Sequence, residues 1–255
     1  MSSEKITLMI QARTGSRRLP RKVLSKIENK PMIWHVINRA KQVRGIDQIV
    51  LLTTKRQEDD ILVKIAKNSN IISFRGHTYD VLSRYYECAK NLDSDLIIRI
   101  TGDCPLIDPT LINKLLKFYL TNKYDYVTNT MPPTFPDGLD TEIFSFKVLK
   151  KISQLSKMKS EREHVTPYIR KNKNKFKTFN LKNNVDLSKL RWTVDEKSDL
   201  LFVRKIYEKM RPKIVFGFED VLKILHNNPE INEINRGITR NQGYAKSLKN
   251  DRKIK

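Results

Sequence analysis

Long apolar runs, paired cysteines and a secretion signal are all absent from this sequence of 255 residues. No apolar stretch reaches the roughly 18–20 residues that a helix needs to cross a bilayer, which excludes a membrane span. Residues 1–5 show no basic segment leading into an apolar one, so we expect no signal peptide. Only Cys88 and Cys104 occur, without Cys-x-x-Cys spacing. This excludes a disulfide framework and a cysteine-based zinc site, and it favours a reducing cytoplasm.

Internal repeats and glycine-serine linkers are also absent. Hydrophobic residues make up 39% of the chain and charged residues 31%, which suffices for a sizeable core beneath a polar surface. We therefore expect a single domain over residues 1–240, with an elaborated second half, followed by a polar C-terminal tail over residues 241–255.

The charge is strongly positive, with 50 Lys and Arg against 28 Asp and Glu, a formal net charge of +22. The excess peaks over residues 147–189. A basic chain can bind nucleic acid, or its lysines can simply keep the surface soluble. No zinc-finger or RNA-recognition motif occurs, and Tyr168, Phe176 and Phe179 do not form an interleaved stacking array. These absences argue against nucleic acid as the partner and favour attraction of an anionic small substrate.

Strand and helix patterns alternate through the first half of the chain. Short apolar runs predict strands at residues 6–11, 49–53, 71–74, 96–100 and 124–128. Three- and four-residue apolar spacing predicts helices at residues 32–44, 59–68, 80–91 and 109–119. Because the strands are continuous apolar runs, they predict a mostly parallel sheet with helices on both faces, an α/β fold. Ligands of such sheets bind beyond the carboxyl ends of the strands.

The rhythm changes after Asn129, where a proline-rich loop begins. The patterns that follow predict strands at residues 140–144, 176–181 and 191–194. Helices are predicted at residues 146–155, 161–169, 198–210 and 218–227.

The loop after the first predicted strand combines glycine, serine and positive charge. It runs from Ala12 to Lys22 and places Gly15 and Ser16 beside five cationic side chains: Arg13, Arg17, Arg18, Arg21 and Lys22. The P-loop ending and the three glycines of a dinucleotide fingerprint are both missing. A basic surface loop is one interpretation, but its place at the carboxyl end of a strand favours phosphate binding.

Two aspartates follow predicted strands far apart in the sequence. Asp103 comes after the fourth strand and a glycine, so it is expected to face the crevice of the first loop. Mg²⁺ is typically held by one or two carboxylates together with phosphates and water, which makes Asp103 a candidate ligand. Asp195 precedes a predicted helix; it is either a second ligand or a helix N-cap.

A series of motifs resembles those of the CMP-sugar-forming cytidylyltransferases, the enzymes that activate 3-deoxy-manno-octulosonate and sialic acids. Within this family, the motifs most resemble those of the SpsF-type spore-coat polysaccharide branch. The motifs cover nearly the whole chain in order and lie at residues 11–24, 30–33, 74–76, 80–86, 99–108, 136–142, 162–168, 191–195 and 234–244. Two positions depart from the pattern: Arg21 replaces the usual glycine and Lys197 the usual proline. Neither change removes a charged group.

The resemblance implies a three-layer α/β/α Rossmann-like fold of the nucleotide-diphospho-sugar transferase (GT-A-like) type and transfer of CMP from CTP with loss of pyrophosphate. It implies that Arg13, Lys22 and Asp103 are catalytic and that Asp103 and Asp195 hold Mg²⁺. The expected nucleotide-binding residues are Ala12, Arg13, Gly15, Ser16, Lys22, Arg75, Asp80, Arg84, Thr101 and Asp103.

The acceptor is expected to be an anionic sugar or sugar-like molecule, bound by the region around residues 130–190. The candidate residues are Asp137, Asp140, Glu142, Arg162, Glu163 and His164, of which His164 is interpreted as structural. The alternative is that these residues form a salt-bridged surface of a homodimer, the assembly that the resemblance implies. No residue is identified as the general base.

Two other functions stay open at this point. A GT-A-like glycosyltransferase would need an Asp-x-Asp after a strand, and the Thr101-Gly102-Asp103 segment supplies one carboxylate. A nucleic-acid-binding protein would show affinity that falls steeply with salt.

Overall fold

The computed structural model describes residues 4–16, 18–213 and 215–254 and contains a central sheet of seven strands. Arg17, one of the five cationic side chains of the first loop, lies outside the described residues. The sheet order is β5-β4-β1-β6-β8-β7-β9. The strands are β1 (Ile6–Gln11), β4 (Gln48–Thr54), β5 (Ile72–Gly76), β6 (Leu96–Thr101), β7 (Tyr126–Thr128), β8 (Glu142–Ser145) and β9 (Thr178–Asn180).

Parallel pairing joins β5, β4, β1 and β6, as the continuous apolar runs predict. β8 is antiparallel to both β6 and β7 and lies between them, so the sheet is mixed but mostly parallel. The chain enters β8 through the long proline-containing loop that follows Thr128. This loop breaks the strand-helix alternation and lets β8 enter the sheet between β6 and β7 from the opposite direction.

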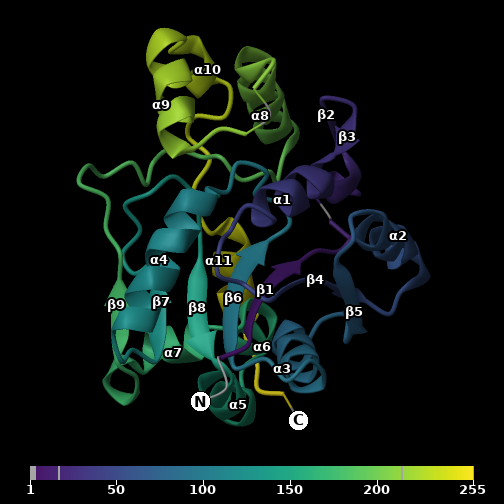
Figure 1. Ribbon diagram of the computed structural model, residues 1–255, viewed down its shortest axis with the longest axis vertical. Helices are drawn as coiled ribbons and strands as arrows, with labels where there is room; N and C mark the ends of the chain where they lie inside the picture. The colour runs from purple at the N-terminus through teal and green to yellow at the C-terminus, as the bar shows by residue number, and fades with distance from the viewer. Residues whose placement is uncertain (1–3, 17, 214, 255) are drawn as a thin grey trace.

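Helices cover both faces of the sheet (Figure 1). The first apolar layer packs beneath α1 (Met32–Ala40), α2 (Asp60–Asn68), α4 (Pro109–Thr121), α8 (Lys197–Met210) and α9 (Phe218–Asn227). The second packs beneath α3 (Val81–Asn91), α5 (Phe146–Leu155) and α7 (Pro167–Lys171). Alternation along β1 divides its side chains between the two layers, with Leu8 and Ile10 in one and Met9 in the other. This confirms the three-layer α/β/α architecture.

Three local predictions need correction. The helix predicted over residues 161–169 is two helices, α6 (Lys159–His164) and α7, because Val165 adopts a positive φ of 73° and Pro167 begins a new helix. Residues 191–194 form no strand: Arg191 makes an isolated parallel bridge with Asp137, and Val194 N donates to the carbonyl oxygen of Asp103 at 2.8 Å. The polar segment expected as a tail contains helix α11 (Gln242–Lys249).

Short elements complete the fold. A hairpin joins β2 (Lys26–Ile27) to β3 (Lys30–Pro31), and its turn residues Glu28 and Asn29 both have positive φ. α10 (Glu230–Glu233) lies with α8 and α9 at one end of the molecule, at the top of Figure 1. Among the described residues, no helix is both long and apolar enough to span a membrane.

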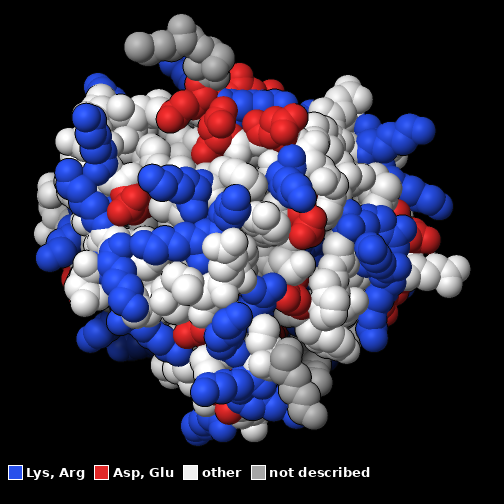
Figure 2. All heavy atoms as spheres, turned by 90° about the horizontal axis from the view of Figure 1, so that it is seen from below, with Lys and Arg blue, Asp and Glu red and all other residues white. Residues whose placement is uncertain are grey.

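Lys and Arg side chains are spread across the face shown in Figure 2, and Asp and Glu side chains lie among them. On this face the positive charge is therefore distributed rather than gathered into one stripe. The prediction that nucleic acid is not the partner stays a prediction.

Candidate active site

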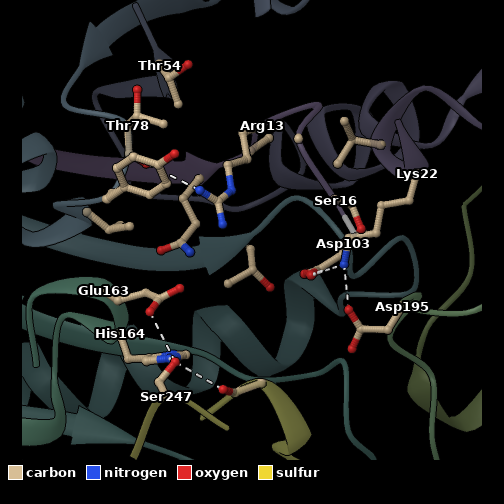
Figure 3. Close-up of a pocket in the computed structure, with 18 of the residues that line it drawn as sticks. Arg13, Ser16, Lys22, Thr54, Thr78, Asp103, Glu163, His164, Asp195 and Ser247 are labelled. Atoms are coloured by element: carbon tan, nitrogen blue, oxygen red, sulfur yellow. Dashed lines mark hydrogen bonds and ion pairs between the residues drawn. The ribbon is translucent and has the colours of Figure 1, made fainter. Parts of the chain in front are cut away.

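A cavity of about 760 Å³ opens where the carboxyl ends of β1, β4, β5 and β6 meet (Figure 3). Its walls come from the loop after β1, the segments after β4 and β5, the end of β6, helix α6 and the C-terminal helix α11. The predicted residues that line it are Ala12, Arg13, Gly15, Ser16, Lys22, Arg84, Thr101, Asp103, Glu163, His164 and Asp195. The volume lies within the range typical of small-molecule sites.

Lys22 brings the two predicted metal-binding aspartates together. Its Nζ lies 2.8 Å from Asp103 Oδ2, 2.7 Å from Asp195 Oδ1 and 2.9 Å from the carbonyl oxygen of Val194. Burial would lower the pKa of Lys22, but Asp103 and Asp195 outweigh it and raise that pKa. The lysine is therefore a protonated ammonium shared by two carboxylates.

Asp103 is ionised at neutral pH. Burial alone would raise its pKa, but the neighbouring Lys22 ammonium lowers the pKa of Asp103 to about 2. The residue before it, Gly102, lets the end of β6 approach the first loop. A Cβ at Gly102 would lie 2.8 Å from Ala12 Cβ and 3.1 Å from the carbonyl oxygen of Gln11, closer than side chains normally pack.

Asp195 is held by three cations and does not cap a helix. Arg18 Nη2 lies 2.8 Å and Arg191 Nη2 3.0 Å from its Oδ2, while Lys22 occupies its Oδ1. The N-cap of α8 is Glu196. Arg191 is buried and also pairs with Asp199, so it fixes the position of Asp195 relative to α8. The N-cap alternative for Asp195 is therefore wrong.

A buried aspartate that sequence reasoning did not assign to the site positions the first loop. Asp59 Oδ1 accepts hydrogen bonds from Thr14 N and Thr14 Oγ1, each at 2.7 Å, and its Oδ2 accepts one from Thr54 Oγ1. Burial would raise the pKa of Asp59, but these hydrogen bonds lower it. In the sequence Asp59 resembles an ordinary helix-start aspartate; only the fold brings it beneath Thr14.

Arg21, which replaces the usual glycine of the motif, has a backbone conformation that favours glycine. Arg21 adopts a left-handed backbone with φ 54° and ψ 27°, and its N–H donates to the carbonyl oxygen of Thr14 at 3.1 Å. Glycine takes this conformation without strain, whereas a residue with a Cβ pays about 1–2 kcal/mol. The usual glycine of the motif thus matches the backbone that the loop requires.

Two arginines flank the same cavity without a carboxylate partner among the described residues. Arg13 Nη1 donates to the carbonyl oxygen of Thr78 at 3.4 Å, and Arg84 donates to the carbonyl oxygens of His77 and Thr78. Burial lowers the pKa of Arg84. Both side chains therefore offer positive charge to an anionic ligand.

Three predicted residues lie outside the cavity lining. Arg75 pairs with Asp60 at 2.6 Å and donates to the carbonyl oxygens of Thr54 and Arg56. Asp80 caps α3, because its Oδ1 accepts from Ser83 N at 2.8 Å, and its Oδ2 accepts from Arg162 Nε at 2.9 Å. The Asp80–Arg162 pair thus joins α3 to α6 beside the cavity.

The acidic residues of the acceptor prediction also lie outside the lining. Asp137 lies 3.0 Å from Arg191 and Asp140 pairs with Arg240. Burial and the neighbouring Asp140 raise the pKa of Asp137 to about 7. Glu142, only 2% exposed, has a separate set of partners. These are Arg99, Tyr126, Thr166 and Arg170.

His164 and Glu163 line the cavity on the side opposite Arg13 and Ser16 (Figure 3). His164 Nε2 lies 3.0 Å from Ser247 Oγ, and Ser247 Oγ donates to Glu163 Oε2 at 3.1 Å. Burial lowers the pKa of His164 to about 4, so the ring is neutral at pH 7. Ser247 belongs to α11, a helix that the sequence patterns did not predict.

The donor set can be tested for a divalent cation. Among the described residues, no group of three or more His, Cys, Asp or Glu side chains is arranged to hold a metal ion. Asp103 and Asp195, however, both contact the Lys22 ammonium, so their carboxylates are close enough to bind one small divalent cation together. Two carboxylates completed by phosphates and water match the way proteins bind Mg²⁺.

Comparison with known proteins identifies the family. A family model described as cytidylyltransferase matches residues 7–233. An uncharacterised protein from Methanocaldococcus jannaschii is 36% identical over 236 residues, covering 92% of this chain and 96% of that protein. The spore coat polysaccharide biosynthesis protein SpsF from Bacillus subtilis is 28% identical over 234 residues, covering 88% of this chain and 95% of that protein.

A solved structure agrees in fold and sequence. A cytidylyltransferase from Leptospira borgpetersenii serovar Hardjo-bovis superposes with a TM-score of 0.88 at 33% identity, covering 93% of this chain and 100% of that one. With its three-layer fold and a cavity at the carboxyl ends of the parallel strands, this chain belongs to the cytidylyltransferase family and is a CTP-dependent nucleotidyltransferase.

Proposed function

We propose that this cytidylyltransferase transfers CMP from CTP to an anionic sugar or sugar-like acceptor, in the synthesis of a surface polysaccharide or glycan. The observation that carries the proposal is the meeting of Lys22, Asp103 and Asp195 in one cavity beside a basic, glycine-containing loop. Phosphoryl-group chemistry depends mostly on positioning and on neutralising charge, and this arrangement offers both.

The triphosphate is assigned to the first loop. Arg13 supplies a planar guanidinium, Lys22 a compact ammonium, and Gly15 and Ser16 backbone groups on the same wall of the cavity. Arg84 adds charge, and Ala12 and Thr101 complete the adjoining surface. Arg75 and Asp80 act on this wall through the segments that they hold and not by direct contact.

Asp103 and Asp195 are the residues that would hold Mg²⁺. When bound, the ion would polarise the phosphate and offset the charge shared by two carboxylates and a triphosphate. Arg191 keeps Asp195 in place for this role, and Arg18 neutralises its outer oxygen.

The reaction forms one bond and breaks another at the α-phosphorus. An acceptor oxygen attacks in line, the bond from the α-phosphorus to the bridging oxygen breaks, and pyrophosphate leaves. The hydroxyl proton of the acceptor is released. Lys22 and Arg13 stabilise the negative charge that develops on the departing and transferring groups, an effect that is typically the largest single contribution to catalysis.

The class of acceptor is supported by charge and by likeness. The cavity adds Arg18, Arg56, Lys159 and Lys246 to the cations already named, which favours an acidic acceptor. The Bacillus subtilis relative carries a name from spore coat polysaccharide biosynthesis, which supports a glycan product.

The test is pyrophosphate release from each of the four nucleoside triphosphates with Mg²⁺, against a panel of acidic sugars and their neutral counterparts. We expect release with CTP and at least one acidic sugar, and a CMP-linked product by mass spectrometry. Turnover with neutral sugars alone would overturn the proposed acceptor class.

A further inference from the structure

The C-terminal segment, residues 241–254, forms one wall of the cavity. Gln242, Lys246 and Ser247 of α11 line it, next to Lys159 and His164 of α6. The match to the family model ends at residue 233, before this segment begins.

The end of this segment is paired with the start of α6. Lys159 N donates to the carbonyl oxygen of Arg252 at 2.9 Å, and Ile254 N donates to that of Lys157 at 2.8 Å. Asp251 accepts hydrogen bonds from Ser160 N at 2.9 Å and from Ser160 Oγ at 2.6 Å. These bonds fix the polar segment on the body of the domain.

Helix α11 connects two opposite walls. At its start, Gln242 Oε1 accepts a hydrogen bond from Arg18 Nη1 of the first loop at 2.8 Å. Further along, Ser247 bonds to Glu163 and His164 of α6, and the Tyr244 ring packs edge-on against His164 with 5.0 Å between centroids. The helix therefore closes the cavity between the phosphate-binding loop and α6.

Among the described residues, the lysines of this wall lack carboxylate partners, as Arg13 and Arg84 do, whereas three other cations of the cavity have them. Arg18, Lys22 and Arg56 each pair with a carboxylate. Within the described part of the chain, Lys159 and Lys246 line the cavity with no ion pair to a carboxylate. The structure thus places two lysines, together with Glu163, on the wall across the cavity from the loop assigned to the triphosphate.

We propose that this wall recognises the acceptor, with Lys246 and Lys159 as the contacts for its negatively charged group. The inference rests on the proposed function, because it requires an anionic acceptor. The first loop already supplies the triphosphate with cations and backbone groups, so the second wall is left for the second substrate. A carboxylate of a sugar acid is a group that lysine ammoniums lining the cavity would bind.

The test compares Lys246→Met and Lys159→Met with Lys249→Met, a matched change on α11 at an exposed lysine that does not line the cavity. Steady-state kinetics use the acidic sugar that supports wild-type turnover. We expect each cavity variant to raise the acceptor KM by about tenfold or more, the size of one lost hydrogen bond to a charged group. The KM for CTP should stay near wild type, and Lys249→Met should match wild type in both.

The KM values for CTP and for the acceptor show which substrate this wall binds. A higher KM for CTP with an unchanged acceptor KM would give the wall to the nucleotide and overturn the inference, as would wild-type values in both cavity variants. Unchanged thermal unfolding midpoints would show that the variants fold. If the wild-type protein uses no acidic sugar, the proposed function itself fails and the inference fails with it; wild-type turnover with unaffected variants refutes the inference alone.

Discussion

Two clusters built around charged side chains adjoin the sheet, and they differ in what they face. The open cluster comprises Lys22, Asp103 and Asp195, with Arg18 and Arg191 around Asp195. The closed cluster comprises Glu142 with Arg99, Arg170, Tyr126 and Thr166. The side chains of Asp103 and Asp195 keep 28% and 24% of their surface exposed, whereas Glu142 keeps 3%.

The pKa values of the carboxylates do not distinguish the two clusters. Against the effect of burial, Lys22 lowers the pKa of Asp103 to about 2, and Arg99 and Arg170 lower the pKa of Glu142 to about 2. The difference is access, because one cluster lines the cavity, whereas the carboxylate of the other is buried between β6, β8 and α7, although its partner Arg170 keeps 33% of its side chain exposed. A perturbed carboxylate therefore marks a candidate site only when a ligand can reach it.

The largest effect on stability is expected from Glu142→Gln. This change removes the charge that compensates Arg99 and Arg170 in a buried setting. Breaking such a pair typically costs about 3–5 kcal/mol of unfolding free energy. Urea unfolding at pH 7 measures the loss, and the KM values for both substrates should stay near wild type in the folded protein.

The pH dependence of that loss provides its control. The folded-state pKa of Glu142 lies below its ordinary value of 4.5, at about 2. The stability it contributes is thus fully present above pH 4.5 and disappears as the pH falls toward 2. The gap between wild type and Glu142→Gln should shrink over that window. A gap that is constant with pH, or a raised acceptor KM in a stable variant, would contradict the structural role and restore the acceptor contact.

Turnover should respond most to the open cluster. One interpretation of the sequence makes the first loop a basic surface loop, but the structure buries Lys22 between two aspartates. Lys22→Ala should lower kcat by about 10²–10³, the usual loss for one preorganised electrostatic contact. It should destabilise the fold less than Glu142→Gln, because Arg18 and Arg191 still neutralise Asp195 and because Asp103, with 28% of its side chain exposed, is solvated better than Glu142. Lys26→Ala, at an exposed position close by, serves as the control; near-normal kcat in folded Lys22→Ala would remove the triphosphate from this loop.

The smallest effect is expected at Asp80, which joins neither cluster. Asp80→Ala removes the cap of α3 and the partner of Arg162, at a cost of about 1 kcal/mol in unfolding free energy. Thermal unfolding and the KM for CTP together check this result. A large rise in that KM without loss of stability would mean that Asp80 contacts the nucleotide directly.

The periodic patterns predict most of the fold because apolar runs and helix faces are local properties. β1, α5 and α9 begin and end where the sequence places them. The insertion of β8 between β6 and β7 depends on the path of a long loop, which spacing does not reveal. Helix α11 is missed because it is short and polar and buries none of its residues, and its position comes from hydrogen bonds to α6 and Arg18.

The candidate site divides in the same way. Lys22, Asp103 and Asp195 were expected to share an edge of the sheet because each follows a strand or an apolar segment, and the structure brings them within hydrogen-bonding distance. Asp59 and Lys246 carry no comparable pattern. Long-range packing decides which charged or polar residues face the cavity and which pair in the interior. His164 and Glu142 were both predicted to contact the acceptor, but His164 lines the cavity and Glu142 is buried among its partners.

We propose that Asp103 and Asp195 act as one unit in a metal-dependent reaction of CTP. The most direct measurement is pyrophosphate release as a function of Mg²⁺ for wild type, Asp103→Asn, Asp195→Asn and the double variant. We expect each single variant to fold and to lose metal-dependent turnover, and we expect the double variant to be little worse than either, as for residues that work together. If Asp195→Asn keeps the wild-type rate and Mg²⁺ dependence, Asp195 is no more than a structural partner of Lys22 and the shared site is wrong.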